Sequence, residues 1–171
     1  TRKESSAASD VYKRQNPGAQ VNPVDNQILC NDELTDPIQF TTLNTDGVTE
    51  YNWTNTNTSI GLPSAGTGDI GSFSVVNTST SAQSATITVT PTYTNNGVIC
   101  SGNPEQFTIT VNPSAQVNGL ADYNTILCDG EFTPVYSFST ANTDGLTTFN
   151  WTNNNVAIGS VSYTHLTLPT T

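Results

Sequence analysis

The chain of 171 residues carries 14 acidic side chains against 4 basic ones, a formal net charge of −10 at pH 7. A surface this acidic repels the phosphate backbone of nucleic acids, and no run of about twenty apolar residues is present to cross a bilayer. We therefore expect neither nucleic-acid binding nor membrane insertion.

The basic residues Arg2, Lys3, Lys13 and Arg14 all lie near the amino end. Residues 1–15 and 161–171 differ in character from the middle of the chain, and both resemble translated adapter or assembly scars of metagenomic sequences. The alternative is a native basic arm and a native tail. On the first interpretation neither segment belongs to the fold. The module between them has no lysine, which excludes lysine-containing isopeptide cross-links.

The middle of the chain repeats itself. Asn-Pro-Gly-Ala-Gln-Val-Asn at 16–22 returns, with one change, at 112–118, an offset of 96 (112 − 16). Three further motifs return 98 residues later (126 − 28): Ile-Leu-Cys at 28–30, Asn-Thr-Asp-Gly at 44–47 and Asn-Trp-Thr-Asn at 52–55. A period near one hundred residues is the size of one β-sandwich domain. We expect one complete module at 16–112 and the first half of a second at 113–160.

Alternation of apolar and polar residues recurs along the module, while no segment has the period of a helix. The expected strands, in chain order, are 38–43, 48–54, 70–76, 85–90, 98–100 and 107–111. Asp46-Gly47 and Asn96-Gly97 predict turns, because glycine accepts a positive φ without a Cβ clash.

Particular residues refine the expected strands. Val48 is expected near Tyr51 and Trp53, and Phe73 and Val75 on one face of their strand. Pro91 predicts a bulge or an edge, because proline has no N–H to donate. About seven short strands with frequent turns predict an all-β immunoglobulin-like sandwich.

Two of the three cysteines, Cys30 and Cys100, fall in the complete module, and Cys128 is the second copy of Cys30. Without CxxC spacing or a nearby histidine, such a pair favours a disulfide over a metal site. We predict a Cys30–Cys100 disulfide, which implies a protein outside the cytoplasm. Two unpaired buried thiols are the alternative.

The module resembles the PKD-like (polycystic-kidney-disease-like) immunoglobulin-type repeats of large bacterial surface proteins. The resemblance covers residues 16–160 and depends on Tyr51-Asn52-Trp53, on the run from Ala85 to Pro91, and on Phe107 to Pro113. It implies a spacer or adhesive module displayed at the cell surface or secreted. Its partners would be neighbouring repeats of the same chain, together with surface glycans or proteins.

The module offers little chemistry for catalysis. The one histidine, His165, lies outside it, which excludes Ser-His and Cys-His arrangements and histidine metal sites. The absence of Lys and Arg removes Schiff-base chemistry and phosphate clamps. The remaining carboxylates are expected in turns or on edges: Asp32, Glu33, Asp36, Asp46, Glu50 and Asp69. We expect no enzyme activity and no catalytic or cofactor-binding residue.

Calcium is the one metal hypothesis that the sequence offers. Asp32, Glu33 and Asp36 supply hard oxygen ligands within five positions, but no D-x-[DN]-x-[DN]-G loop is present. In the second copy the acidic positions are Asp129 and Glu131. A solvated acidic turn is the alternative, and we assign no metal ligand.

Trp53 and Trp151 occupy the same position in the two copies, on strands where a sandwich buries its tryptophan in the core. Stacking on sugar rings is the alternative. The Asn-Thr-Ser runs at 57–59 and 77–79 match the glycosylation sequon, and in so Asn/Thr-rich a chain chance explains the matches.

The leading functional hypothesis is a structural repeat, and its alternatives are a carbohydrate- or protein-binding module and an accessory domain of a secreted polysaccharide-degrading enzyme.

Overall fold

The computed structural model describes residues 15–119 and 125–158, and the backbone of 166–167. The expected amino-terminal scar, apart from Gln15, and nearly all of the carboxyl-terminal one lie outside the described residues. The described chain is all-β, with two short 3-10 helices, η1 (Thr58–Ile60) and η2 (Val156–Ile158). The strands of the first copy are β1 (Gln27–Cys30), β2 (Val48–Asn55), β3 (Ala65–Thr67), β4 (Gln83–Asn95), β5 (Val98–Ser101) and β6 (Glu105–Asn112).

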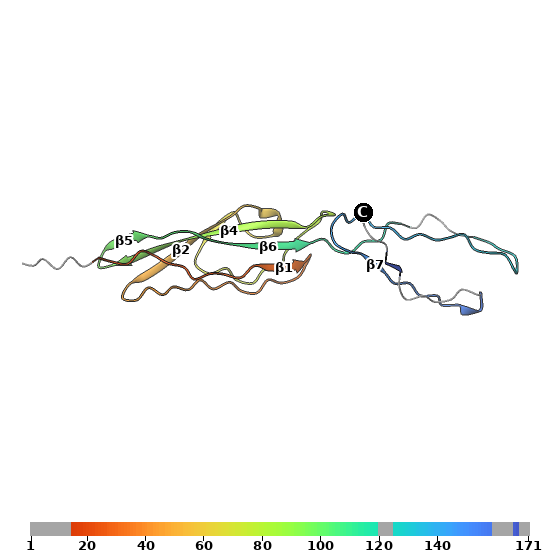
Figure 1. The fold of residues 1–171 in the computed structure, drawn as a ribbon, viewed down its shortest axis with the longest axis horizontal. Helices are drawn as coiled ribbons and strands as arrows, with labels where there is room; N and C mark the ends of the chain where they lie inside the picture. Colours follow the sequence, from red (N-terminus) through yellow and green to blue (C-terminus); the bar gives the residue numbers. More distant parts are fainter. Residues whose placement is uncertain (1–14, 120–124, 159–165, 168–171) are drawn as a thin grey trace, which may run out of the picture.

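These six strands form one mixed sheet in the order β1-β6-β4-β2-β3, and β5 also pairs with β4 (Figure 1). The β1–β6 pair is parallel, and the other pairs are antiparallel. The thirteen-residue β4 pairs with β2 along one side and with β6 and then β5 along the other. It is therefore the central strand of the sheet.

The expected alternation at 85–90 is confirmed and extends further. The buried side chains of β4 are Ala85, Ile87, Val89, Pro91 and Tyr93. The carbonyl of Pro91 accepts a hydrogen bond from Gly102 N. Because the N–H and C=O of one strand residue point to the same side, the missing N–H of Pro91 faces the gap between β6 and β5. β4 therefore tolerates proline at this position, because the strand paired along that side changes there from β6 to β5.

The Asn96-Gly97 turn is confirmed, whereas the segments around Ile38 and Ile70 differ from expectation. Asn96 and Gly97 both have positive φ, 50° and 77°, which a two-residue hairpin of type I′ requires. The expected strands 38–43 and 70–76 form no continuous ladder and meet in one isolated bridge, Ile38–Ile70, where the two backbones exchange hydrogen bonds. The 70–76 segment makes further contacts with residues before the expected strand 38–43, in a Leu34–Ser74 bridge and a hydrogen bond from Thr35 N to the Phe73 carbonyl.

Alternation in these segments reflects burial rather than regular pairing. Ile38, Phe40, Ile70 and Val75 are buried in the same cluster as the inward side chains of β4 and β6. Phe73 and Val75 do share a face, with Phe73 packed against that cluster. Val48, in contrast, is 64% exposed while Tyr51 and Trp53 are buried, because β2 alternates regularly and leaves Val48 out of phase.

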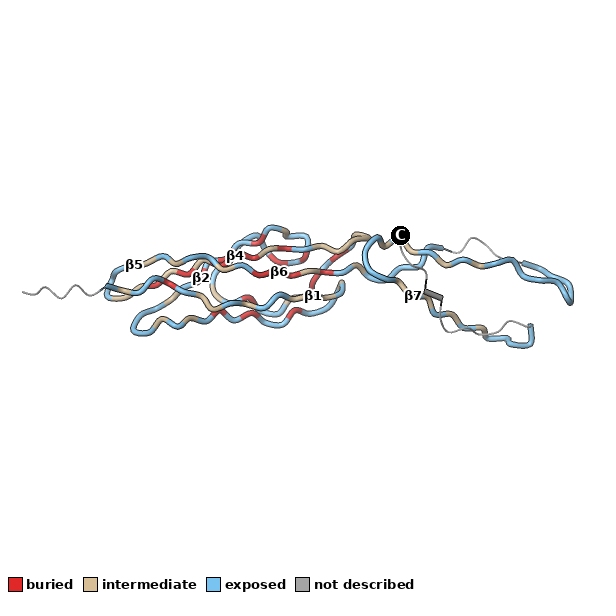
Figure 2. Tube along the Cα trace, viewed as in Figure 1, coloured by how far each residue is buried: buried red, intermediate tan, exposed pale blue. Residues whose placement is uncertain are grey.

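The second copy reproduces the local structure of the first over the part that is present. Cys128 N donates to the Glu131 carboxylate at 2.8 Å, as Cys30 N does to Glu33. The Phe138 and Phe149 rings lie 5.8 Å apart, and the equivalent Phe40 and Tyr51 rings 5.5 Å. Burial differs: the buried residues of Figure 2 lie in the first copy, and none of the described residues of 125–158 is buried. The one strand pair among the described residues beyond 112 joins β7 (Thr148–Phe149) to β8 (Leu166–Thr167), which lies in the expected carboxyl-terminal scar.

Candidate functional site

The three carboxylates proposed for calcium do not converge on a common point. Glu33 accepts a hydrogen bond from Cys30 N at 2.8 Å and so closes its own turn. Asp32, in the left-handed region at φ 69°, accepts from the Asn31 side chain. Asp36 bonds through its backbone, which exchanges two hydrogen bonds with the Gln27 amide. Among the described residues, no group of three His, Cys, Asp or Glu side chains is placed to hold a metal ion.

Four of the described carboxylates, those of Glu33, Asp69, Glu131 and Asp144, accept hydrogen bonds from backbone N–H groups. Every Lys and Arg lies at or before Arg14, so no described residue offers a cationic side chain of that kind. Asp69 accepts from Phe40 N at 2.8 Å, and Asp144 accepts from Ala82 N at 2.9 Å. Such charge-assisted bonds are roughly twice as strong as neutral ones. These four acidic residues therefore fix turns and hold extended segments in place.

A depression of about 330 Å³ lies beside Asp25 and Asp36, lined by the 23–27 and 36–39 segments. Its polar lining consists of Asp25, Asn26, Gln27, Asp36 and Gln39. Asn26 and Gln27 are already engaged, since Asn26 accepts from Thr108 N and Gln27 bonds Asp36.

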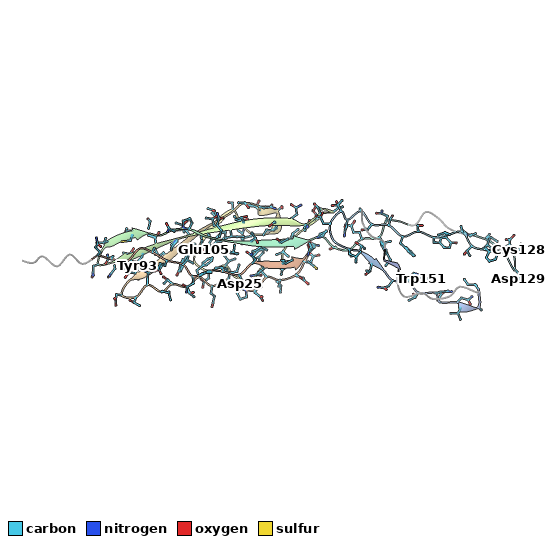
Figure 3. The ribbon with its side chains drawn as sticks, in the orientation of Figure 1. Asp25, Tyr93, Glu105, Cys128, Asp129 and Trp151 are labelled. Atoms are coloured by element: carbon cyan, nitrogen blue, oxygen red, sulfur yellow. The ribbon has the colours of Figure 1, made fainter. Side chains whose placement is uncertain are left out.

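As Figure 3 shows, Asp129 lies at the far tip of the second copy, well away from Asp25 and Glu105.

The predicted Cys30–Cys100 disulfide is wrong for this structure, in which all three cysteines are free. Cys30 ends β1 and pairs with Asn112, next to the Val111–Gln83 pair, whereas Cys100 on β5 pairs with Tyr93. Gln83 and Tyr93 are ten residues apart along β4 (93 − 83), which is roughly 33 Å in a strand. A disulfide requires Cα atoms within about 7 Å. Figure 1 places β5 and the end of β1 at opposite ends of the first copy.

The expected core position of Trp53 is confirmed. Trp53 is 7% exposed, and its Nε1–H donates to the Gly68 carbonyl at 3.2 Å, so its ring face is not available to a sugar. Trp151 is half-buried.

The Asn-Thr-Ser runs have a structural role that the sequence analysis missed. The side-chain oxygens of Asn57 and Asn77 accept from the N–H and hydroxyl of the serine two residues on, Ser59 and Ser79. These are Asx turns, which asparagine and serine favour. Asn77 is also buried and donates to the Ser81 and Val111 carbonyls. The repeated Asn-Thr-Ser spacing was the signal that could have revealed both turns.

The second feature that sequence reasoning missed is a polar junction between the two copies. The second Asn-Thr-Asp-Gly motif lies against the 80–82 loop of the first copy. Thr143 N donates to the Thr80 carbonyl at 2.9 Å, and Ala82 N donates to the Asp144 carboxylate at 2.9 Å. Exact repetition of Asn-Thr-Asp-Gly in both copies was the signal, interpreted only as a turn.

No helix of the described residues has the length and apolar character needed to cross a membrane. Comparison of the sequence with protein families, with curated proteins and with solved structures finds no match.

Proposed function

We propose that this chain is part of a non-catalytic extracellular repeat protein, in which immunoglobulin-like, PKD-like modules act as a spacer or adhesive stalk on a large bacterial surface or secreted protein. The observation that carries the proposal is the position of the two ends of the first copy. Asn16 exchanges side-chain hydrogen bonds with Asn95, at the end of β4. Asn112 follows Val111, which pairs with Gln83 at the start of β4.

The chain thus enters the module at one end of its longest strand and leaves it at the other. Thirteen residues of strand correspond to roughly 40 Å. Figure 1 shows the second copy continuing beyond the first along the long axis. Modules joined in this way add length with each repeat, which is what a spacer requires.

The all-β fold supports an immunoglobulin-like sandwich, because the extended segments around Ile38 and Ile70 bury their side chains against the same face of the sheet as β4 and β6. A place outside the cell follows from the resemblance to PKD-like surface repeats. The satisfied carboxylates and the buried Trp53 support a structural role over catalysis or sugar binding.

The complete open reading frame tests the proposal. Many further copies of the module would support a stalk, whereas a single copy beside a catalytic domain would favour an enzyme accessory domain. Small-angle scattering of chains with one, two and three copies should show a maximum dimension that grows by roughly 40 Å per copy. A dimension that stays constant as copies are added would contradict a spacer. Retention on a glycan array would instead favour the carbohydrate-binding alternative.

A further inference from the structure

The junction is built from two matched hydrogen-bonding groups on each side. The 80–82 loop offers a carbonyl at Thr80 and an N–H at Ala82, and the second turn offers an N–H at Thr143 and a carboxylate at Asp144. The Thr143 hydroxyl also donates to the Thr80 carbonyl at 3.4 Å. Each N–H on one side therefore meets an oxygen acceptor on the other side. The two hydrogen bonds together fix how the loop and the turn align.

The first copy carries the same four residues, Asn44 to Gly47, and their asparagine makes the same backbone contact. Asn44 donates from its side chain to the Gly18 carbonyl at 3.0 Å, and Asn142 donates in the same way to Ser114, the counterpart of Gly18, at 2.9 Å. Each turn is thereby tied to the first residues of its own module. The left-handed residue differs between the turns: Asp46 has φ 64° in the first, and Gly145 has φ 77° in the second.

Thr45 and Asp46, the counterparts of Thr143 and Asp144, are both exposed. Among the described residues, the N–H of Thr45 has no hydrogen-bond partner, and the Asp46 carboxylate accepts only from the Thr45 hydroxyl, at 3.4 Å. The groups that make the junction in the second copy are thus present, and available, on the first.

We propose that the Thr45–Asp46 turn is a docking surface for the 80–82 loop of a second copy of this module that precedes it in the chain. The proposal rests on the proposed function, because it requires an array of modules. The partner is identified by its chemistry: a carbonyl and an N–H two residues apart on one loop, as Thr80 and Ala82 present them.

Two features favour this partner. None of the described residues is Lys or Arg, so a carboxylate at a junction between copies must bind an uncharged donor, and the N–H of Ala82 is the donor that Asp144 uses. The carboxylate of Asp46 lies on a turn held to Gly18, at the end of the module where a preceding copy would be joined. Because the turn sequence repeats, each junction of an array would present the same donor and acceptor groups to the preceding 80–82 loop.

The test is a tandem chain in which a copy of residues 16–111 is inserted directly before Asn16 of the full chain. Segmental isotope labelling distinguishes the inserted copy, and amide hydrogen exchange is measured at its Ala82. We expect this amide to exchange at least as slowly as the original Ala82, whose partner Asp144 lies in the less buried second copy. Asp46→Asn in the original module should speed exchange at the inserted Ala82 roughly fivefold, because the acceptor loses its charge.

The matched control is Asp144→Asn, which changes the same turn in the other copy. It should speed exchange at the original Ala82 and leave the inserted one unchanged. The proposal is overturned if the inserted Ala82 exchanges like an unprotected amide, or if Asp46→Asn has no effect on it. Scattering of the same tandem chain separates the two ideas, since added length without Ala82 protection leaves the spacer function standing and rejects the docking contact.

Discussion

Gly66 lies opposite Trp53 in the β2–β3 pair, and the indole ring occupies the space of a Cβ at that position. We expect Gly66→Ala to destabilise the first copy by about 1–3 kcal/mol, since the ring must shift within a packed core. Urea unfolding followed by tryptophan fluorescence measures the loss.

Gly71→Ala is the matched control, because a Cβ at Gly71 meets no atom within 4 Å. It should change the free energy of unfolding by less than about 0.5 kcal/mol. Equal effects of the two substitutions would show that Trp53 does not pack against Gly66 as described.

Burial raises the pKa of the Tyr51 phenol above its ordinary value of 10.0, and the nearby Asp69 carboxylate raises it further, while a hydrogen bond with Thr42 acts in the opposite direction. The folded state therefore favours the neutral phenol. Its contribution to stability is complete below about pH 10 and is lost as the pH rises through the folded-state pKa.

Tyr51→Phe should reduce this loss. Denaturant unfolding at about pH 9 and about pH 11 should show a smaller fall in stability for the phenylalanine variant than for the unchanged chain. A fall of the same size in both proteins would mean that the Tyr51 phenol titrates alike in the folded and unfolded states.

At the scale of elements, the two copies have the same local turns but different cores. In the first, β2 pairs with β4 along its whole length, from Val48–Thr94 to Asn55–Ile87. In the second, the described residues contain no counterpart of β4 or β6. A groove of about 480 Å³, lined in part by Phe138 and Phe149, lies along the segment equivalent to β2. Local turns form from nearby residues, but a core needs a second layer.

We therefore predict that residues 16–112 fold alone and that the second copy is weakly protected. Amide hydrogen exchange should show strong protection in 85–111 and little in 136–152, because exposed backbone hydrogen bonds open readily. An exposed strand edge also favours pairing with another molecule, so the measurement should be repeated at several protein concentrations. Equal protection of the two segments at the lowest concentration would contradict the prediction.

At the scale of the whole molecule, the chain carries 14 acidic residues, and no Lys or Arg follows Arg14 to balance their charge. Their mutual repulsion is screened by salt, as the Debye length falls from about 30 Å at 0.01 M to about 10 Å at 0.1 M. We expect the melting temperature to rise with NaCl over this range, and calorimetry measures it.

The same titration tests calcium. Because Glu33 already binds an N–H group and the three carboxylates do not converge, CaCl₂ and MgCl₂ at equal ionic strength should raise the melting temperature by the same amount. A larger increase with calcium at millimolar concentration would reveal a specific site and contradict this reading of Asp32, Glu33 and Asp36.

Several features of the fold follow from neighbouring residues and were therefore predictable. The alternation at 85–90 and 107–111 predicted β4 and β6, because a strand with one buried face must alternate. Asn96-Gly97 predicted its hairpin, since both residues accept positive φ. The same alternation at Ile38 and Ile70 predicted burial correctly but continuous strands wrongly. Periodicity shows which face is covered, not whether a neighbouring backbone is in register.

By itself, the sequence determined the repeat, the all-β class and the absence of Lys and Arg from the module, because these depend on residue identity and spacing along the chain. Only the tertiary structure decided that Cys30 and Cys100 lie near opposite ends of β4, that Asp69 binds the N–H of Phe40, and that Asp144 binds the N–H of Ala82. Each of these facts is a distance between residues far apart in the chain. The order of strands in the sheet sets such distances, and no local pattern encodes that order.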